Sequence, residues 1–426
     1  MGETAQPRRI GFRAAFGPGL LWAAAAIGVS HLVQSTRAGA DAGLGLAAVI
    51  LLALILKYPF FEYGPRYAAA TGMSLVEGYR RIGRWALWLY FLITLTTSVV
   101  IQSAIVLFTA FLVNYALGLD WPLPLMGAVV VLVCGAMLWI GRFVWLDRVV
   151  KVILVLLAVS TVAAAVVALD RLDVSTLAIV PSVGAGDGAV PFAFLLALVG
   201  WMPSAIDIAV WSSLWTLAKN TAAGGRVSVA MARADFAVGY AATGFLAFCF
   251  LILGAGVLYG SGTSFSASGT VFSTQLVALY GQTLGAWMRP VVLVAVLTTM
   301  LSTSITVVDG FPRAIERTLY NLRPSHGETA DLPSAGSLYW GALLTLGVAT
   351  VLVLGLFAGT LTALVDFATI VSFLTAPVLG YLNLRAVRAP EVPPQDRPTA
   401  RMVALSWVGL VLLGGTAVVY LASLVR

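Results

Sequence analysis

Charged residues are scarce in this sequence, and so are cysteine and histidine. Only 10% of the 426 residues are Asp, Glu, Lys or Arg, while 60% are hydrophobic and the mean hydropathy is +0.97. Soluble domains carry about 25% charged residues and do not bury this much apolar surface. The composition therefore excludes a soluble globular protein and predicts a polytopic integral membrane protein.

The residues that most enzymes use occur in no recognisable arrangement. The chain has two histidines and two cysteines, with no nucleophile, histidine and carboxylate set, no phosphate-binding loop and no dinucleotide fingerprint. Cys134 and Cys249 both lie in apolar stretches, where a cysteine packs as a small apolar side chain. We therefore expect no enzyme, no disulfide, no metal site and no bound cofactor.

Long apolar runs define the expected architecture. About 20 apolar residues cross a hydrocarbon core, and about eleven such runs occur. Residues 1–426 are predicted to form one all-α transmembrane domain, with a first repeat at 17–169, a second at 191–384 and an additional helix at 402–425. The Gly- and Ser-rich stretch 260–285 is expected to be an outer loop. The predicted spans are 17–46, 47–70, 85–116, 122–141, 149–169, 191–217, 234–259, 287–309, 336–357, 361–384 and 402–425.

Basic residues are distributed unevenly around these spans. The chain has 25 Lys and Arg against 18 Asp and Glu, a formal charge of +7. With a cytoplasmic N-terminus, most of the basic residues fall on the cytoplasmic side, in agreement with the positive-inside rule. This predicts a protein of a bacterial inner or plasma membrane, with the C-terminus outside. Orientation in the lipid bilayer explains the excess of basic over acidic residues, so no nucleic-acid partner is expected.

Two predicted spans are interrupted at similar depth. The first contains "GVSH" at 28–31 and the sixth contains "GWMPS" at 200–204. Two sets of five helices, each opening with a broken helix, are typical of inverted-repeat secondary transporters. Unpaired backbone groups cost several kcal/mol each in lipid unless they line a polar cavity, so the breaks predict a central site. A simple kink at Pro203 is the alternative reading of the second break.

Several stretches resemble the Nramp family of proton-coupled divalent metal transporters. They are "FGPGLLWAAAAIG" opening the first span, "AGADAGL" closing it, and "ATGMSLVEGYR" at 70–80. The resemblance implies the LeuT-type (APC) fold, with about 11 transmembrane helices in a 5+5 inverted repeat, the first and sixth unwound around the substrate.

The chain departs from the family where metal or protons bind. The resemblance places the family's Asp-Pro-Gly-Asn ligand motif on residues 28–31, its metal-contacting Met on Ser204, and its two proton-linked acids on Gln102 and Ile105. Gly28 therefore stands in place of the ligating carboxylate. A dehydrated divalent cation needs carboxylates or similarly strong ligands, so these replacements argue against a transition metal.

Hydroxyls, an imidazole and helix ends remain to bind a substrate, a set that suits a small anion. We predict a secondary active transporter of a small inorganic ion, with bicarbonate or a similar anion preferred. His31 is alternatively a structural residue that fixes the break, and Gln102 an interhelical hydrogen-bonding residue. The predicted substrate-binding residues are Gly28, Val29, Ser30, His31, Gly200, Trp201, Pro203, Ser204 and Gln102.

Two charged residues near the breaks are expected to act in the vestibule or in gating. Arg37 either steers an anion inward or pairs with Asp41 or Asp207. Asp207 is the carboxylate nearest the second break, and it is alternatively a proton acceptor or a cation ligand.

Sodium is the coupling ion that we consider. The stretch "LSTSIT" offers hydroxyls on the eighth span, although packing by small residues is an equal alternative. The candidate coupling-ion residues are Ser302, Thr303, Ser304 and Thr306.

Other intramembrane charges receive structural interpretations. Lys57 and Glu62 are expected at the bundle interface or snorkelling to the membrane surface. Asp309 is predicted to pair with Arg313, and Asp366 is either intramembrane or a helix cap.

Two rival functions remain open. One is a divalent cation transporter, for hydrated Mg²⁺ or for Mn²⁺, that uses Asp207 and carbonyl groups. The other is a membrane sensor that binds a ligand without transport. The sequence leaves the oligomeric state open, and a monomer is compatible with it.

Overall fold

The computed structural model describes residues 17–140, 143–184, 189–323, 336–357 and 360–425. The N-terminal tail 1–16, which we predicted to be cytoplasmic, lies outside the described residues. Within them the fold is all-helical apart from one isolated bridge between Val183 and Val190. This confirms the predicted all-α class.

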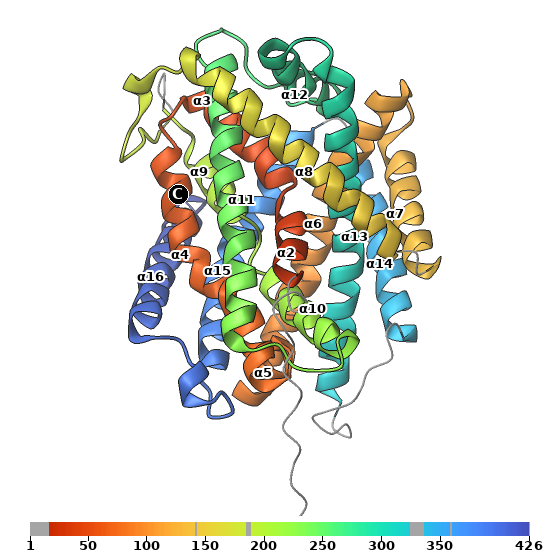
Figure 1. Ribbon diagram of the computed structural model, residues 1–426, viewed down its shortest axis with the longest axis vertical. Helices are drawn as coiled ribbons and strands as arrows, with labels where there is room; N and C mark the ends of the chain where they lie inside the picture. Colours follow the sequence, from red (N-terminus) through yellow and green to blue (C-terminus); the bar gives the residue numbers. More distant parts are fainter. Residues whose placement is uncertain (1–16, 141–142, 185–188, 324–335, 358–359, 426) are drawn as a thin grey trace, which may run out of the picture.

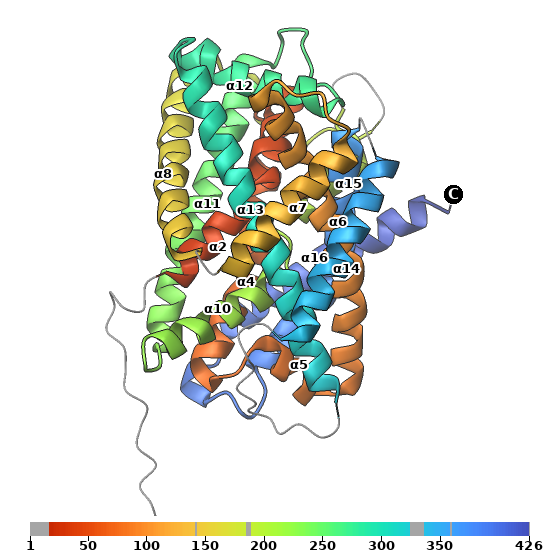
Figure 2. The same ribbon diagram turned by 90° about the vertical axis from the view of Figure 1, so that its right-hand side faces the viewer.

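The helices form one bundle (Figures 1 and 2). Among the described residues, eight helices are long and apolar enough to span a bilayer. Together with α8 and two interrupted spans, they account for the predicted runs. The helices are α2 (Pro18–Ala26), π-helix η1 (Ser30–Ser35), α3 (Thr36–Ala42), α4 (Ala47–Thr71), α5 (Leu75–Ile82), α6 (Arg84–Leu117), α7 (Leu123–Ile140), α8 (Phe143–Ala168), α9 (Phe192–Gly200), α10 (Ile208–Ala222), α11 (Val229–Val257), α12 (Gly269–Leu284), α13 (Met288–Leu322), α14 (Ser337–Leu356), α15 (Leu361–Val387) and α16 (Ala400–Ser423).

Both interruptions lie where they were predicted. The first separates α2 from η1 and α3, and the second separates α9 from α10. In Figure 1 the end of α2 lies near mid-height in the bundle, with α3 continuing toward one end of the molecule and α10 lying toward the other. Pro203 has no backbone N–H and cannot continue the helix of α9, and four residues separate it from Ile208, where α10 begins.

Glycines allow the broken helices to pack backbone against backbone. A Cβ atom on Gly39 of α3 would lie 2.0 Å from the Leu251 carbonyl oxygen, and one on Gly254 of α11 would lie 2.1 Å from the Thr36 carbonyl oxygen. The same holds at the end of α9, where a Cβ on Gly200 would lie 2.0 Å from the carbonyl oxygen of Thr369 in α15. Such close approaches are typical of small residues between membrane helices.

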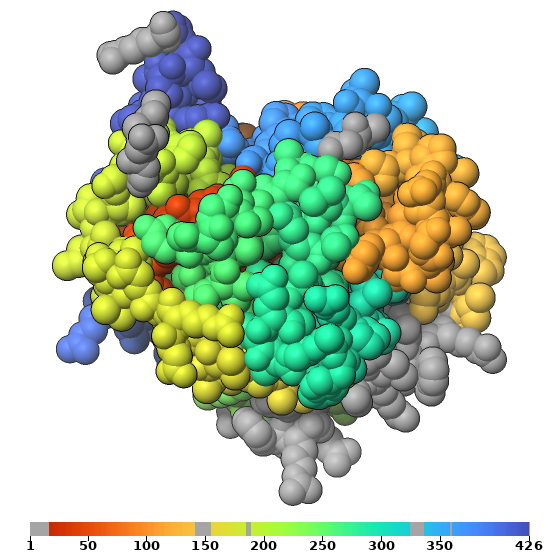
Figure 3. Space-filling view, turned by 90° about the horizontal axis from the view of Figure 1, so that it is seen from above, coloured from red at the N-terminus to blue at the C-terminus, as the bar shows by residue number. Residues whose placement is uncertain are grey.

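The prediction of an outer loop over 260–285 is wrong in its second half, because residues Gly269–Leu284 form α12. Sequence reading gave weight to the Gly and Ser residues, but Phe272, Leu276 and Tyr280 recur at helical spacing and are fully buried. Phe272 meets Phe108 of α6 with ring centroids 5.9 Å apart. Figure 3 views the molecule from the end that carries α12, and residues of α11 and α12 cover much of the middle of that face.

A buried carboxylate ties the opposite end of the bundle together. Glu62 of α4 is fully buried, and its Oε1 accepts from Arg66 Nη2 at 2.7 Å and from Arg233 Nε of α11 at 2.6 Å. The predicted interface position of Glu62 is therefore confirmed, and so is the Asp309 to Arg313 pair, at 2.7 Å.

Removing the Glu62 carboxylate is expected to destabilise the protein strongly. Glu62→Ala leaves the buried Arg66 guanidinium without its counter-ion, and breaking such a pair costs about 3–5 kcal/mol. Thermal unfolding of the detergent-solubilised protein measures the effect, with the exposed Asp170→Ala as control. Equal unfolding temperatures for the two variants would contradict this account.

Candidate functional site

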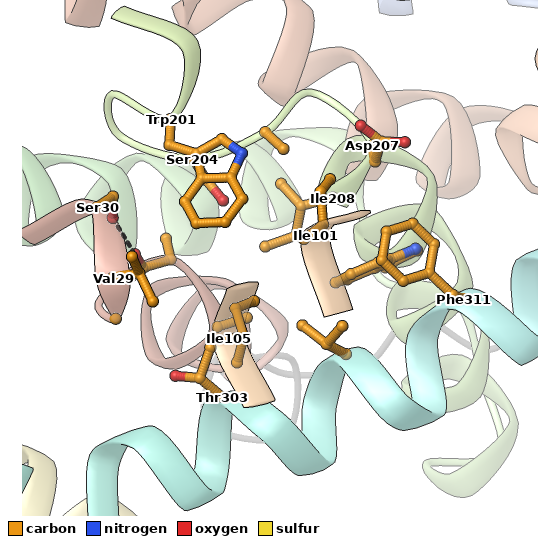
Figure 4. A pocket seen from close by; sticks show the side chains of 16 residues that line it. Val29, Ser30, Ile101, Ile105, Trp201, Ser204, Asp207, Ile208, Thr303 and Phe311 are labelled. Atoms are coloured by element: carbon orange, nitrogen blue, oxygen red, sulfur yellow. Dashed lines mark hydrogen bonds between the residues drawn. The ribbon is translucent and has the colours of Figure 1, made fainter. Parts of the chain in front are cut away.

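A small cavity lies between the two helix breaks (Figure 4). Its volume is about 40 Å³. Because one water needs about 10–15 Å³ by the same measure, the cavity holds a compact ion or about three waters. The end of α2, the two breaks, α6, α10 and α13 contribute its walls. The lining residues used below are Gly28, Val29, Ser30, Ile101, Ile105, Trp201, Ser204, Asp207 and Thr303.

Most of the cavity wall is apolar, with a few polar side chains. Three hydroxyl residues line it, namely Ser30, Ser204 and Thr303. Asp207 is the carboxylate of the cavity: its Oδ1 accepts from the Thr97 hydroxyl at 2.7 Å, while its buried Oδ2 has no hydrogen-bond partner. Trp201 closes one side, and its indole N–H donates to Ser372 of α15 at 2.8 Å.

The carbonyl ends of the broken helices are already engaged. Nζ of the fully buried Lys57 lies 3.0 Å from the Val199 oxygen, 2.9 Å from the Gly200 oxygen and 2.8 Å from the Ser204 oxygen. In the first break the Ser30 hydroxyl donates to the Ala26 oxygen at 2.8 Å. Three oxygens at the second break and the Ala26 oxygen at the first are therefore occupied by donors of the chain itself.

The amide ends are left open. Backbone hydrogen bonds also form outside the regular helices. Among those of the described residues, none has the N–H group of residues 28–30 or 204–206 as its donor. These residues lie at or just before the N-terminal ends of η1, which starts at Ser30, and of α10, which starts at Ile208. Because most of them line the cavity, the positive ends of both helical segments lie next to it.

His31 and Gln102, two predicted substrate-binding residues, do not line this cavity in the described structure. The fully buried His31 ring has Nε2 3.0 Å from the Thr243 oxygen of α11 and Nδ1 2.8 Å from the Ser30 hydroxyl. Gln102 Nε2 donates to the Thr350 hydroxyl of α14 at 3.0 Å. Their contacts match the structural alternatives stated for both. Gly200 ends α9 and Pro203 lies within the second break, and neither lines the cavity in the described structure.

The expected pairing of Arg37 with Asp41 or Asp207 is wrong. Its guanidinium pairs with Asp366 of α15, with Nη1 2.8 Å from Oδ1, and it stacks 4.6 Å from the centre of the Phe194 ring. Gln34 donates to the same Asp366 oxygen at 2.9 Å. Asp366 is therefore an ion-pair partner rather than a helix cap.

The four candidate coupling-ion residues point in different directions. Thr303 lines the cavity, whereas Ser304 lies 2.9 Å from the Thr109 hydroxyl of α6. The Thr306 hydroxyl donates to the Ser302 oxygen at 2.9 Å within α13.

Lys57 is the residue that sequence reasoning missed. Of the two positions expected for it, the bundle interface is confirmed and snorkelling is wrong, because its side chain is fully buried and its ammonium reaches the second break. The available signal was a lysine inside an apolar span, but its partners are 142 to 147 residues away in sequence.

Comparison with known proteins decides the family. The family model "Natural resistance-associated macrophage protein-like" (Nramp) matches residues 19–423. The chain belongs to the Nramp family. An uncharacterised protein of Pasteurella multocida is 34% identical over 412 residues, covering 96% of this chain and 92% of the relative.

Solved structures show that this Nramp chain has the LeuT-type fold. A manganese transporter of Eremococcus coleocola, in complex with an aromatic bis-isothiourea substituted compound, superposes with a TM-score of 0.70 at 16% identity, covering 99% of this chain and 90% of the other. The transporter MhsT in complex with L-phenylalanine gives 0.60 at 15% identity, covering 99% and 100%. The protein is thus an integral membrane transporter rather than an enzyme.

Three of the four positions that the resemblance sets against the family's metal-binding and proton-linked residues line the cavity. Gly28, Ser204 and Ile105 all line it, while Gln102 faces α14. A Cβ atom on Gly28 would lie 3.1 Å from Thr303 Oγ1, so a longer side chain there would need Thr303 to move. At Gly28 the first break therefore packs closely against α13.

Thiol labelling distinguishes residues that line the cavity from those that do not. In a Cys134→Ala/Cys249→Ala background, Ser204→Cys and Thr303→Cys are expected to react with a small water-soluble methanethiosulfonate. Thiol reactivity follows exposure, so His31→Cys and Gln102→Cys should react about tenfold or more slowly. Equal labelling rates at the four positions would refute the assigned orientations.

Proposed function

We propose that this Nramp-family protein is a secondary active transporter of a small inorganic anion, with bicarbonate as its preferred substrate. The observation that supports the proposal is the asymmetry at the breaks: the carbonyl oxygens are occupied by Lys57 and Ser30, whereas the amide ends stay open. Amide ends of helices bind anions. A cavity of about 40 Å³ suits a compact ion.

The composition of the cavity also supports an anion. Within the described residues, no group of three or more His, Cys, Asp or Glu side chains is placed to hold a metal ion. Asp207 contributes one carboxylate, and it interacts electrostatically with the Lys57 ammonium. The Ser204 hydroxyl can donate to an oxygen of bicarbonate, whereas the Ser30 and Thr303 hydroxyls already donate to the Ala26 and Thr299 oxygens.

One observation favours a second candidate, a divalent cation such as Mn²⁺ or hydrated Mg²⁺. Asp207 lines the cavity, and its buried Oδ2 atom has no hydrogen-bond partner in the described structure. An unpaired carboxylate oxygen attracts a cation. The manganese transporter of Eremococcus coleocola with the same fold makes this the natural rival.

Coupling and orientation complete the proposal. Sodium would bind near Thr303, the candidate hydroxyl that reaches the cavity. The end of the molecule that carries Glu62, Arg66 and Arg233 would face the cytoplasm, because basic residues collect on that side of a membrane.

Uptake into proteoliposomes tests the substrate. Labelled bicarbonate is expected to accumulate, faster with an inward sodium gradient, while Mn²⁺ and Mg²⁺ do not. Ser204→Ala should raise the half-saturation concentration about five- to tenfold, the effect of one hydrogen bond of about 1 kcal/mol.

Asp207→Asn separates the two candidates, because it removes a negative charge but little volume. Bicarbonate uptake should persist in this variant if the substrate is an anion. Mn²⁺ uptake by the wild type that is lost in Asp207→Asn would refute the anion and establish the divalent cation. Uptake that is unchanged without sodium would refute sodium coupling.

The Arg37 to Asp366 pair is proposed to close the cavity toward the α12 end. Its side chains are 14% and 28% exposed, and a partly exposed pair contributes up to about 1 kcal/mol. Arg37→Gln is therefore expected to increase outside labelling of Ser204→Cys by up to about fivefold. The exchange Arg37→Asp/Asp366→Arg should return the rate toward the original value. A rate that both variants leave unchanged would exclude this gate.

A further inference from the structure

The ammonium of Lys57 sits in an oxygen cage that would otherwise bind a free cation. Its three oxygens come from Val199, Gly200 and Ser204, at 2.8–3.0 Å from Nζ. A lysine ammonium has three N–H donors, so each donor has one carbonyl. The face of the Phe61 ring lies 5.5 Å from Nζ and adds a cation–π contact. The charge is buried, yet it is fully coordinated.

The opposite charges of Lys57 and Asp207 affect which ion the cavity can accept. Lys57 and Asp207 are both buried, with 0% and 2% of their surfaces exposed, and each acts electrostatically on the other. Together they leave the second break without net charge, so an anion meets no uncompensated carboxylate. Without the ammonium, three carbonyl oxygens and the Asp207 carboxylate would present a net negative site, which favours a cation.

We propose that Lys57 is a tethered cation that determines the sign of the transported ion: it fills the carbonyl cage at the end of α9 and thereby reserves the cavity for an anion. The proposal rests on the proposed function, since it assumes that the wild type carries an anion. Lys57 acts by positioning the second break and setting its charge, and it does not line the cavity itself.

Replacing the ammonium by an uncharged amide tests the role of the charge. Lys57→Gln keeps N–H donors for the carbonyl oxygens but removes the positive charge. Bicarbonate uptake is expected to fall by about tenfold or more, because a unit charge beside a buried ion contributes that much even at a moderate effective dielectric. Uptake of radioactive rubidium, a substitute for potassium, is expected to appear.

The double variant Lys57→Gln/Asp207→Asn is the matched control. It makes the break neutral again, so rubidium uptake should disappear and part of the bicarbonate uptake should return. A purely structural lysine would not produce this exchange of ion selectivity. Two outcomes overturn the proposal: wild-type bicarbonate uptake in Lys57→Gln, or a folded Lys57→Gln that takes up no rubidium and is not rescued by Asp207→Asn.

A binding measurement covers the case in which Lys57→Gln does not insert or fold well. Lys57→Ala vacates the cage, and its thermal unfolding is followed in ammonium chloride and in tetramethylammonium chloride at equal ionic strength. Ammonium should raise the unfolding temperature, while the larger ion should not. Lys219→Ala, which removes a lysine from the end of α10, should respond to neither. Identical behaviour of Lys57→Ala in both salts overturns the cage.

Failure of the two proposals is distinguishable. If the wild type takes up Mn²⁺ and no bicarbonate, the proposed function fails, whereas the ammonium response of Lys57→Ala still reports on the cage. If the wild type takes up bicarbonate and the Lys57 variants behave as wild type, the proposed function stands and the tethered-cation proposal fails.

Discussion

The contact between the Lys57 ammonium and three backbone carbonyls at the second break is the interaction on which the site depends. A membrane interior offers no water to an interrupted helix, so the exposed backbone oxygens need a donor from the chain. Lys57 supplies it for α9, and Ser30 does so for α2. Both breaks can then persist at mid-bundle, and the amide ends and the Ser204 hydroxyl between them remain available to a substrate. Breaks, cavity and charge balance thus follow from how the carbonyl oxygens are satisfied.

Much of the fold was predictable because its signals are local. Apolar runs marked the spans, and Gly28 and Pro203 marked the breaks, because these residues change the backbone where they stand. The Asp309 to Arg313 pair is one helical turn apart and was read correctly. Ser204 and Thr303 reach the cavity because a break or a facing helix must present its small polar residues there. Resemblance to the Nramp family supplied the topology that connects these elements.

The side-chain contacts that could not be predicted depend on how each helix is rotated about its axis and on partners that are far away in the sequence. His31 is one residue from Ser30, yet it turns to the Thr243 carbonyl, 212 residues along the chain. Arg37 pairs with Asp366, 329 residues away, although Asp41 is one turn from it. Sequence proximity favoured the nearer acid, but the side chains of Arg37 on α3 and Asp366 on α15 reach each other in the folded chain. The apolar residues of α12 were not recognised as a helix face, because Gly and Ser residues near them favoured a loop prediction.

The glycine contacts divide the bundle into parts that must move together. Where Gly39 and Gly254 bring α3 and α11 into backbone contact, and Gly200 does the same for α9 and α15, neither pair can slide without a steric clash. Between α3 and α15 the bridge consists instead of side chains, those of Arg37, Gln34 and Asp366. Side chains change rotamer quickly, whereas packed backbones do not. The contact between α3 and α15 therefore consists of side chains that can separate by changing rotamer, and alternating access would move the two rigid helix pairs apart there.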